Sequence, residues 1–232
     1  TWVCAAAKDN GGNLGFSSPA EFKIDTAQPA TTATPSGTLG LGGWYISNVI
    51  VTLVCSDADS GCSQTKYCTD TSNGCDPATG TVYSGAFTMS TEGMIYVRYR
   101  STDVAGNSET TKSLQLKIDK TAPTISDNYA YDGTWVNSNQ IVTLNPQDSA
   151  SGISSVKSCE GSGCTPATTI ASPYQLSYTT ETDKIARYQA WDAAGNPSAI
   201  GQYNVKIDKT APSIGIISNP PQTGAWMNVQ ST

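Results

Sequence analysis

The side chains of this chain that could do chemistry are mainly aspartates in a recurring setting. The motif Asp-x-x-Gly-Asn occurs three times, beginning at Asp9, Asp103 and Asp192. Each copy is followed about ten residues later by Lys-Ile-Asp and a proline, and the whole pattern has a period of about 90 residues. Carboxylate oxygens without histidine are the ligands that a hard cation such as Ca²⁺ prefers, so calcium binding is the chemistry that these residues suggest.

The composition argues against catalysis and against polyanionic partners. The 232 residues include no histidine, which removes the commonest general base and the usual activator of a Ser or Cys nucleophile. The aspartates sit in turn motifs that repeat, and catalysis rarely needs identical copies in tandem. The net charge of -6 and the presence of only three arginines also argue against nucleic acid and against contact with a membrane. We predict that the chain is not an enzyme.

Seven cysteines offer a second kind of chemistry. When the two complete copies of the repeat are laid over one another, Cys55 falls on Pro146 and Cys62 falls on Ile153. These two cysteines are therefore gained or lost together, as expected of bonded partners. Four more cysteines occupy equivalent places in the two copies. The overlay predicts three disulfides, Cys55–Cys62, Cys68–Cys75 and Cys159–Cys164.

Disulfides are favoured over metal thiolates, because spacings of five to seven residues without histidine fit zinc sites poorly. They predict an oxidising compartment, and hence an extracellular or cell-surface location. Cys4 remains unpaired in this segment. It occupies the position of Arg98 and Arg187, on the outer face of a predicted strand, and the sequence leaves its partner open.

Short strand patterns, bounded by Gly, Asn, Asp, Ser or Pro, follow one another in both copies without helical periodicity. Such a pattern is typical of an antiparallel β-sandwich. The segments around Trp44 and Trp135 are expected to close one end of each core. Besides a short strand before Pro35, the predicted strands are 49–55, 65–69, 86–89, 94–101 and 114–118 in the first copy, and 141–144, 156–159, 174–178, 185–191 and 203–207 in the second.

The landmarks divide the chain into four parts. Residues 1–29 are expected to be the C-terminal part of a preceding unit, 30–122 and 123–211 to be two whole units, and 212–232 to begin a following unit. A tryptophan recurs in the same phase as Trp44, Trp135 and Trp226. The ends cut through units, so we interpret the chain as an internal piece of a longer mature polypeptide.

Asp-x-x-Gly-Asn followed by Ile-Asp-Lys-Thr-Ala-Pro resembles the bacterial Ig-like repeats of large prokaryotic cell-surface and adhesin-like proteins. The resemblance covers both whole units and both fragments. It implies an all-β protein of tandem Ig-like antiparallel β-sandwiches in a linear array, and calcium is often bound in related surface repeats. The segment around residues 67–70, with Pro77 and residues 83–85, also resembles accessory sandwich modules of chitin- and hexosamine-degrading enzymes.

An Ig-like fold would bring aspartates together wherever one unit meets the next. Carboxylates aimed at one point repel each other unless they bind a cation, so we expect calcium between the units. Each aspartate also has a sufficient role in a turn, and none belongs to the dense loop of an EF-hand, so the sequence leaves both readings open. The candidates are Asp25, Asp57, Asp59 and Asp103 at the first junction, and Asp119, Asp148 and Asp192 at the second.

The function favoured by these patterns is non-enzymatic: extracellular spacer repeats of a cell-surface adhesin-like or filament-forming protein. Its partners would be neighbouring repeats, and other copies of the chain in a filament or surface glycans. The alternative is a carbohydrate-binding or accessory module of a secreted glycan-active protein. That alternative would present exposed aromatic rings as a stacking platform, with candidates Tyr45, Tyr67, Tyr83, Tyr129, Tyr131 and Trp191.

Overall fold

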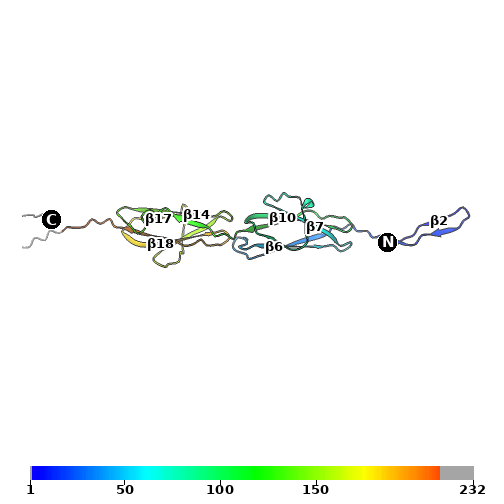
Figure 1. Ribbon diagram of the computed structural model, residues 1–232, viewed down its shortest axis with the longest axis horizontal. Coiled ribbons are helices and arrows are strands. Elements are labelled where there is room, and N and C mark those ends of the chain that lie inside the picture. The colour runs from blue at the N-terminus through cyan, green and yellow to red at the C-terminus, as the bar shows by residue number, and fades with distance from the viewer. Residues whose placement is uncertain (1, 215–232) are drawn as a thin grey trace, which may run out of the picture.

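The structure is a computed structural model that describes residues 2–214. Two β-sandwiches follow one another along the long axis of an elongated molecule, and an extended segment leads from the first sandwich to an N-terminal hairpin (Figure 1). Apart from a short 3-10 helix, η1 at Pro77–Thr79, the regular elements are all strands. Among residues 2–214, no helix has the length and apolar character that a membrane crossing requires.

The first sandwich packs a three-stranded sheet, in the order β5-β6-β9, against a four-stranded sheet, in the order β11-β10-β7-β8. All pairings between these strands are antiparallel. The arrangement matches the two sheets of an Ig-like sandwich, because the chain crosses from one sheet to the other after β6, after β8 and after β9. The strands are β5 (Ala30–Ser36), β6 (Val49–Ser56), β7 (Cys62–Asp70), β8 (Thr81–Val82), β9 (Phe87–Met89), β10 (Gly93–Asp103) and β11 (Lys112–Ile118).

The second sandwich repeats this plan with the sheets β12-β14-β17 and β13-β19-β18-β15-β16. The short strand β13 pairs with β19 in parallel, and in the first sandwich a single parallel bridge joins Tyr45 to Ile118 in the same way. The strands are β12 (Thr124–Asp127), β13 (Trp135–Val136), β14 (Gln140–Gln147), β15 (Ile153–Glu160), β16 (Thr168–Ile170), β17 (Gln175–Tyr178), β18 (Thr182–Asp192) and β19 (Gly201–Ile207).

Side-chain alternation builds one core inside each sandwich. In β10, Val97 and Tyr99 point inward and are at most 7% exposed, whereas Arg98 and Arg100 point outward. Fully burying one aliphatic side chain contributes about 1.5–3 kcal/mol. The buried cluster of the first sandwich is Val49, Val51, Leu53, Val97, Tyr99, Leu116 and Ile118. That of the second is Val142, Leu144, Val156, Ile170, Tyr178, Ala186, Tyr188, Ala190, Tyr203, Val205 and Ile207.

The predicted all-β fold is confirmed, and each of the ten predicted strand segments overlaps an observed strand. The short strand expected before Pro35 is β5, which runs through the proline. The proline is tolerated there because β5 is an edge strand, where a missing backbone donor costs little. Strands β8, β12, β13 and β16 were not predicted, since sequences of two to four residues carry little alternation.

The segments around Trp44 and Trp135 pack against the cores as expected, but through the neighbours Tyr45 and Val136 and not through the two tryptophan rings. Both rings lie on the outer surface, where the ammonium groups of Lys117 and Lys206 are 6.0 and 5.5 Å from the ring centroids. Adjacent residues of an extended segment face opposite sides, so only one neighbour of each pair can reach the core. The residues that do pack against the cores are Tyr45 and Val136.

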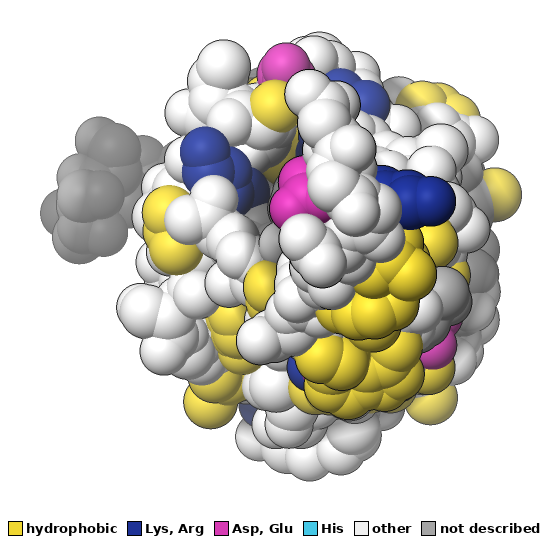
Figure 2. Space-filling model, turned by 90° about the vertical axis from the view of Figure 1, so that its right-hand side faces the viewer, with side chains coloured by type: hydrophobic (Ala, Val, Ile, Leu, Met, Phe, Trp, Pro, Cys, Tyr) yellow, Lys and Arg dark blue, Asp and Glu magenta, His cyan; other side chains and the backbone are white. Residues whose placement is uncertain are grey.

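The N-terminal segment forms two small two-stranded ladders, β1 (Trp2–Val3) with β4 (Ala20–Glu21), and β2 (Ala6–Lys8) with β3 (Leu14–Phe16). No second sheet covers this hairpin among the described residues. Hydrophobic side chains gather at this end of the molecule (Figure 2). Those that are about half exposed or more are Trp2, Val3, Leu14, Phe16, Phe22 and Ile24.

Three disulfides are present, and they join the cysteines that the overlay paired: Cys55–Cys62, Cys68–Cys75 and Cys159–Cys164. Each closes a loop of five to seven residues within one sandwich. Arg98 donates a hydrogen bond to the carbonyl oxygen of Cys75 at 2.6 Å, and Arg187 does the same to Cys164. The arginines that match Cys4 in sequence therefore brace the disulfide loops. Cys4 itself is exposed and unpaired within residues 2–214.

Replacing both Cys159 and Cys164 with serine is expected to destabilise the second sandwich by about 2 kcal/mol, because opening a short loop releases chain entropy in the unfolded state. Urea unfolding of the oxidised wild type and of the double variant measures the difference. The matched control is Cys4→Ser, which removes a free thiol and should leave the unfolding midpoint unchanged. A loss of stability much above 2 kcal/mol would mean that the disulfide also maintains the native conformation of its loop, and that the hydrogen bond from Arg187 to Cys164 is not sufficient to do so.

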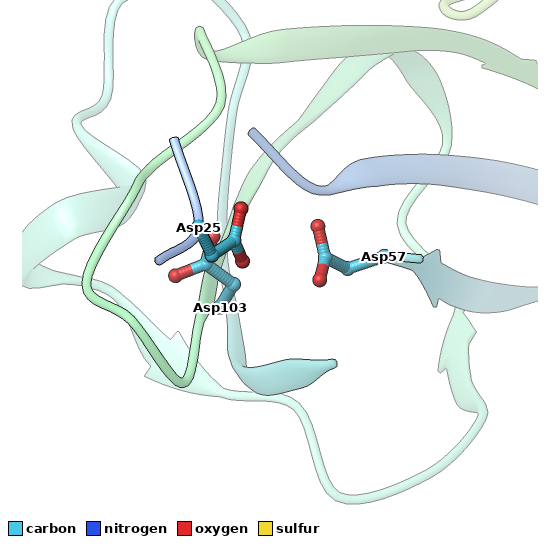
Figure 3. Close-up of side chains that lie close together, drawn as sticks. All are labelled: Asp25, Asp57 and Asp103. Carbon is cyan, nitrogen blue, oxygen red and sulfur yellow. The ribbon is translucent and has the colours of Figure 1, made fainter. Parts of the chain in front are cut away.

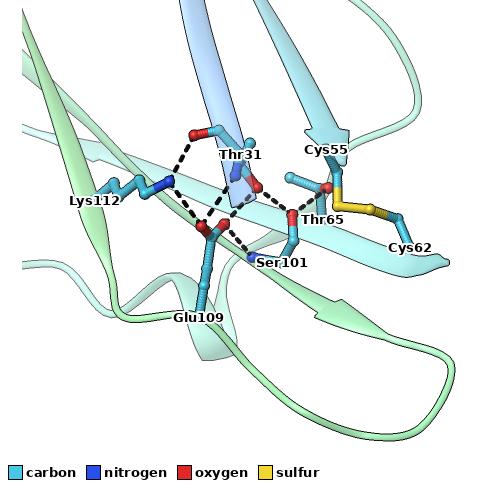
Figure 4. A network of polar contacts seen from close by, with 7 residues as sticks. All are labelled: Thr31, Cys55, Cys62, Thr65, Ser101, Glu109 and Lys112. Atoms are coloured by element: carbon cyan, nitrogen blue, oxygen red, sulfur yellow. Dashed lines mark hydrogen bonds and ion pairs between the residues drawn. A yellow bond between two sulfur atoms is a disulfide. The ribbon is translucent and has the colours of Figure 1, made fainter. Parts of the chain in front are cut away.

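A buried polar network ties the first strand of the first sandwich to its body (Figure 4). Glu109 is only 6% exposed, and its carboxylate accepts hydrogen bonds from the backbone and hydroxyl of Thr31 in β5 and from the backbone of Ser101 in β10. Lys112 completes the network with an ion pair to Glu109 at 2.9 Å. Burial by itself raises the pKa of Glu109, but the hydrogen bonds from Thr31 and Lys112 outweigh it and hold the pKa below its ordinary value.

Glu109→Gln is expected to cost about 2 kcal/mol at neutral pH, because the amide nitrogen cannot accept the hydrogen bonds that the carboxylate takes. The stabilisation by ionised Glu109 is complete above the unfolded pKa of about 4.3. It is lost as the pH falls through the lower folded pKa, since the unfolded chain binds the proton first. Unfolding midpoints at pH 7 and pH 3 measure both effects, with Glu21→Gln, at an exposed position of the N-terminal hairpin, as control. Equal midpoints for wild type and Glu109→Gln at pH 7 would contradict this role.

Candidate metal site at the domain junctions

Two groups of three aspartates form where one unit meets the next. Asp25, Asp57 and Asp103 make the first group, which Figure 3 shows with the carboxylates turned toward a common space. The second group is Asp119, Asp148 and Asp192. In each group, one carboxylate oxygen from every member lies within 4.8 Å of those of the other two. The members come from a linker, from the loop after the second strand, and from the turn between the last two strands.

The turn supplies a buried member to each group. Asp103 ends β10, and its carboxylate accepts hydrogen bonds from the backbone and side-chain nitrogens of Asn107 at 2.8 and 2.9 Å. Asp192 and Asn196 repeat these two bonds, both at 2.8 Å. The glycine of the motif has a φ of +97° in both copies, which only glycine adopts readily. The motif therefore fixes the aspartate on a rigid turn.

The loop after the second strand supplies the second member. Oδ1 of Asp57 accepts the backbone hydrogens of Ser60 and Gly61 at 3.0 and 2.7 Å. Oδ1 of Asp148 accepts those of Ala150 and Gly152. Within residues 2–214, the Oδ2 atoms of both aspartates accept no hydrogen bond, so each retains a free oxygen beside the other carboxylates.

The linker supplies the third member and connects the two units directly. Asp119 follows β11 of the first sandwich and is fully buried. Its carboxylate accepts the backbone hydrogen of Ser151 at 3.1 Å, and its carbonyl oxygen accepts the side-chain nitrogen of Asn196 at 3.2 Å. Both partners belong to the second sandwich. At the first junction, Asp25 takes the same two contacts from Ser60 and Asn107.

The donor set fits a hard cation. Asp103, Asp119 and Asp192 are at most 2% exposed, so mutual repulsion of the carboxylates is weakly screened by water. Hydrogen bonds, led by that from the Ser60 side chain, hold the pKa of Asp25 below its ordinary value. Each carboxylate can accept about four hydrogen bonds or ligand contacts and uses only some of them here. Three oxygen ligands, completed by water, suit Ca²⁺ better than a transition metal.

The structure does not bring Asp59 into the first group, although it lies in the same loop as Asp57. Asp59 is exposed and lines a surface hollow with Ser60, Val104 and Ala105. Residues 21–25 of the linker line the same hollow, so Asp59 lies beside the junction but its carboxylate is outside the group of three. The third tryptophan landmark, Trp226, and most of the expected fourth unit lie outside the described residues.

A contact between the sandwiches was not foreseen from the sequence. The backbone nitrogen of Leu41, in a loop of the first sandwich, donates to the carbonyl oxygen of Ala194 in the second at 2.8 Å. A Cβ atom at Gly40 would lie 2.2 Å from that same oxygen, so the close approach depends on glycine. A glycine and a leucine in a predicted loop carry no signal for such a contact, because it involves segments more than 150 residues apart.

The strand order, the two separate cores and the carboxylate-lined junctions define a tandem β-sandwich protein of the Ig-like class. No protein-family model matches the sequence, and no curated protein sequence matches it. Similar solved structures include the fibronectin(III)-like modules of Clostridium thermocellum CbhA, at 14% identity and a TM-score of 0.33, covering 80% of this chain and 100% of that chain. The D00-D0 domain of intimin is also similar, at 9% identity and a TM-score of 0.36, covering 74% of this chain and 99% of that one. With TM-scores this low, the fold assignment rests on the strand order.

Proposed function

We propose that this chain is a structural spacer of an extracellular or cell-surface protein, in which β-sandwich units stand end to end as a rod of limited bending. The observation that carries the proposal is that the linker between the two sandwiches, residues 119–123, is held from both sides. A linker fixed to one unit only would leave the other free to swing. A linker fixed to both transmits force and orientation along the chain.

On the side of the preceding unit, the linker is held by a lysine and a threonine. Lys120 donates its backbone hydrogen to Glu92 at 3.0 Å and its ammonium hydrogens to Asn48 at 2.9 Å, and Thr121 also donates to Glu92. Lys209 repeats these contacts at the following linker with its own glutamate and asparagine. On the side of the following unit, the hydrogen bonds that Asp119 accepts from Ser151 and Asn196 complete the attachment. Pro123, which follows Thr121 and Ala122, makes the backbone of the linker stiffer.

Calcium is the proposed ligand of both junctions. It would bind Asp25, Asp57 and Asp103 at the first junction, and Asp119, Asp148 and Asp192 at the second. Binding there would neutralise three carboxylates that belong to two different units, and so would favour the in-line arrangement over a bent one. The three disulfides support an oxidising, extracellular setting for this function.

The aromatic residues give little support to a glycan-stacking platform. Tyr67, Tyr83 and Phe87 pack on one another with ring centroids 4.1 to 6.4 Å apart, next to the first core. Tyr129 packs against Tyr203 in the second sandwich. These rings are used inside the fold, so the spacer role is the better-supported function.

Small-angle X-ray scattering of the whole chain tests the rod. We expect a maximum dimension close to that of two sandwiches in line. The dimensions of each sandwich should be nearly the same in calcium and EGTA buffers. Gly40→Ala should increase bending at the second junction, because the new methyl group meets the carbonyl of Ala194. Leu39→Ala, two residues from Leu41 and 62% exposed, is the matched control. A compact, folded-back wild type would overturn the proposal.

A further inference from the structure

A small pocket lies on the outer face of the four-stranded sheet of the first sandwich, opposite the core. It has a volume of about 110 Å³, the space of a few water molecules. No carboxylate lines it, although the chain as a whole carries a net charge of -6. The lining residues are Gln64 and Lys66 of β7, Ala78 of η1, and Arg100 and Thr102 of β10.

The cations of this pocket have donors to spare. Within residues 2–214, the guanidinium of Arg100 has no hydrogen-bond or ion-pair partner. Lys66 donates to the carbonyl oxygen of Ala78 at 3.1 Å, which leaves two of its three ammonium hydrogens available. By contrast, the neighbouring Arg98 is already engaged with Cys75. Arg100 and Lys66 lie directly opposite one another on paired strands, so their side chains share one face.

The carboxylates at the ends of the two strands are engaged elsewhere: Asp103 of β10 is buried and bonded to Asn107 in its turn, and Asp70 is the carboxylate of β7. Asp70 accepts hydrogen bonds from its own turn, from the hydroxyl of Ser72 and from the backbone hydrogens of Asn73, Gly74 and Cys75. Its oxygens are therefore committed locally.

The second sandwich shows that the fold does not require this arrangement. In the overlay of the two units, Gln189 takes the place of Arg100, and Trp191 takes the place of Thr102. The ammonium group of Lys157, which matches Lys66, lies 4.7 Å from the Trp191 ring centroid. The lysine there is covered by an aromatic ring, whereas in the first sandwich a second cation and open space stand beside it.

We propose that Arg100, Lys66 and Gln64 form a binding site for an oxyanion, specifically a carboxylate or sulfate group of an acidic polysaccharide. A guanidinium can donate two parallel hydrogen bonds to such a group, and the ammonium and amide can donate from the adjacent strand. The negative charge of the whole chain disfavours wide, nonspecific contact with a polyanion. Recognition is therefore confined to one group seated in this pocket, which goes beyond the spacer role and does not depend on it.

Isothermal titration calorimetry of the whole chain tests the site with three probes: oligomeric dextran sulfate, oligogalacturonate and neutral dextran. EGTA is present throughout, so that calcium cannot bridge carboxylates. We expect binding to at least one anionic probe and none to neutral dextran. Arg100→Gln, which installs the residue of the second sandwich, should weaken binding roughly tenfold or more. Lys8→Gln makes the same charge change in the N-terminal hairpin and should leave binding unchanged.

The preferred anionic probe identifies the group, sulfate or carboxylate, that the pocket takes. Melting curves establish that Arg100→Gln remains folded. The proposal is overturned if the wild type binds neither anionic probe, or if Arg100→Gln binds as well as the wild type. It is also overturned if Lys8→Gln weakens binding as much as Arg100→Gln does, because the attraction would then be a general charge effect.

Discussion

Removing calcium with EGTA is expected to lower the melting temperature of the chain, and added Ca²⁺ is expected to restore it. A ligand present at a hundredfold excess over its dissociation constant stabilises the folded state by about 2.7 kcal/mol. For a domain of this size that corresponds to a shift on the order of 10 °C. The physical reason is the repulsion among three carboxylate oxygens held within 4.8 Å, which the cation would replace with attraction. Differential scanning calorimetry in EGTA, Ca²⁺ and Mg²⁺ buffers measures the effect.

The first junction offers a matched pair of variants for this experiment. Asp57→Asn removes one carboxylate from the group and should reduce the calcium-dependent shift. Asp59→Asn removes a carboxylate of the same loop that lies outside the group, and it should keep the full shift. Identical melting curves of the wild type in EGTA and Ca²⁺ would show that the groups are held by hydrogen bonds alone.

Asp192→Ala is expected to destabilise the second sandwich by about 3 kcal/mol, even in EGTA. The fully buried carboxylate accepts hydrogen bonds from the backbone of Gly195 and Asn196 and from the Asn196 side chain. Without it, these donors are left unsatisfied in a site from which water is largely excluded. Chemical denaturation in EGTA isolates this structural loss from any loss of calcium.

The N-terminal hairpin contains the control for this substitution. Asp9 makes the same two bonds to Asn13, at 2.9 and 2.8 Å, but its turn is exposed. Asp9→Ala should therefore leave the unfolding of the two sandwiches unchanged. An Asp192→Ala variant as stable as the wild type would mean that water satisfies the freed donors, and that the turn is not a structural requirement.

Asp192→Asn separates the two roles of this carboxylate. The amide keeps one acceptor oxygen for the backbone hydrogens, so it should cost less stability in EGTA than the alanine. It loses the charge, so it should reduce the response to calcium as much as the alanine does. A calcium response that survives in Asp192→Asn would place the cation elsewhere.

The repeat allowed much of the fold to be predicted from the sequence. Strand alternation in segments such as 94–101 and 185–191 is a local property, set by which side chains face the core, and the structure confirms it. The pair Cys55–Cys62 could be assigned because the second copy lacks both cysteines, and the other two pairs because their cysteines occupy equivalent places in the two copies. The outward position of Trp44 could not be predicted, because an aromatic residue just before a strand can point either toward the core or toward the outer surface.

The candidate metal site could be predicted only in part from the repeat. Repetition of the turn and linker motifs identified Asp103, Asp119 and Asp192 as residues that share a setting. The choice between Asp57 and Asp59 depended on the dihedral angles of one loop. Both residues are equally polar and equally suited to a turn, so only the folded loop distinguishes them.

By itself, the sequence determined the β-sandwich class, the repeat and the local disulfides, because each of these depends on residues close together in the chain or on comparison of one copy with the other. The tertiary structure alone decided that Leu41 meets Ala194, that Glu109 holds Thr31, and that Arg100 stands beside Lys66 without a partner among the described residues. These arrangements depend on how distant segments pack and on which directions their side chains then take. No pattern of neighbouring residues encodes that information.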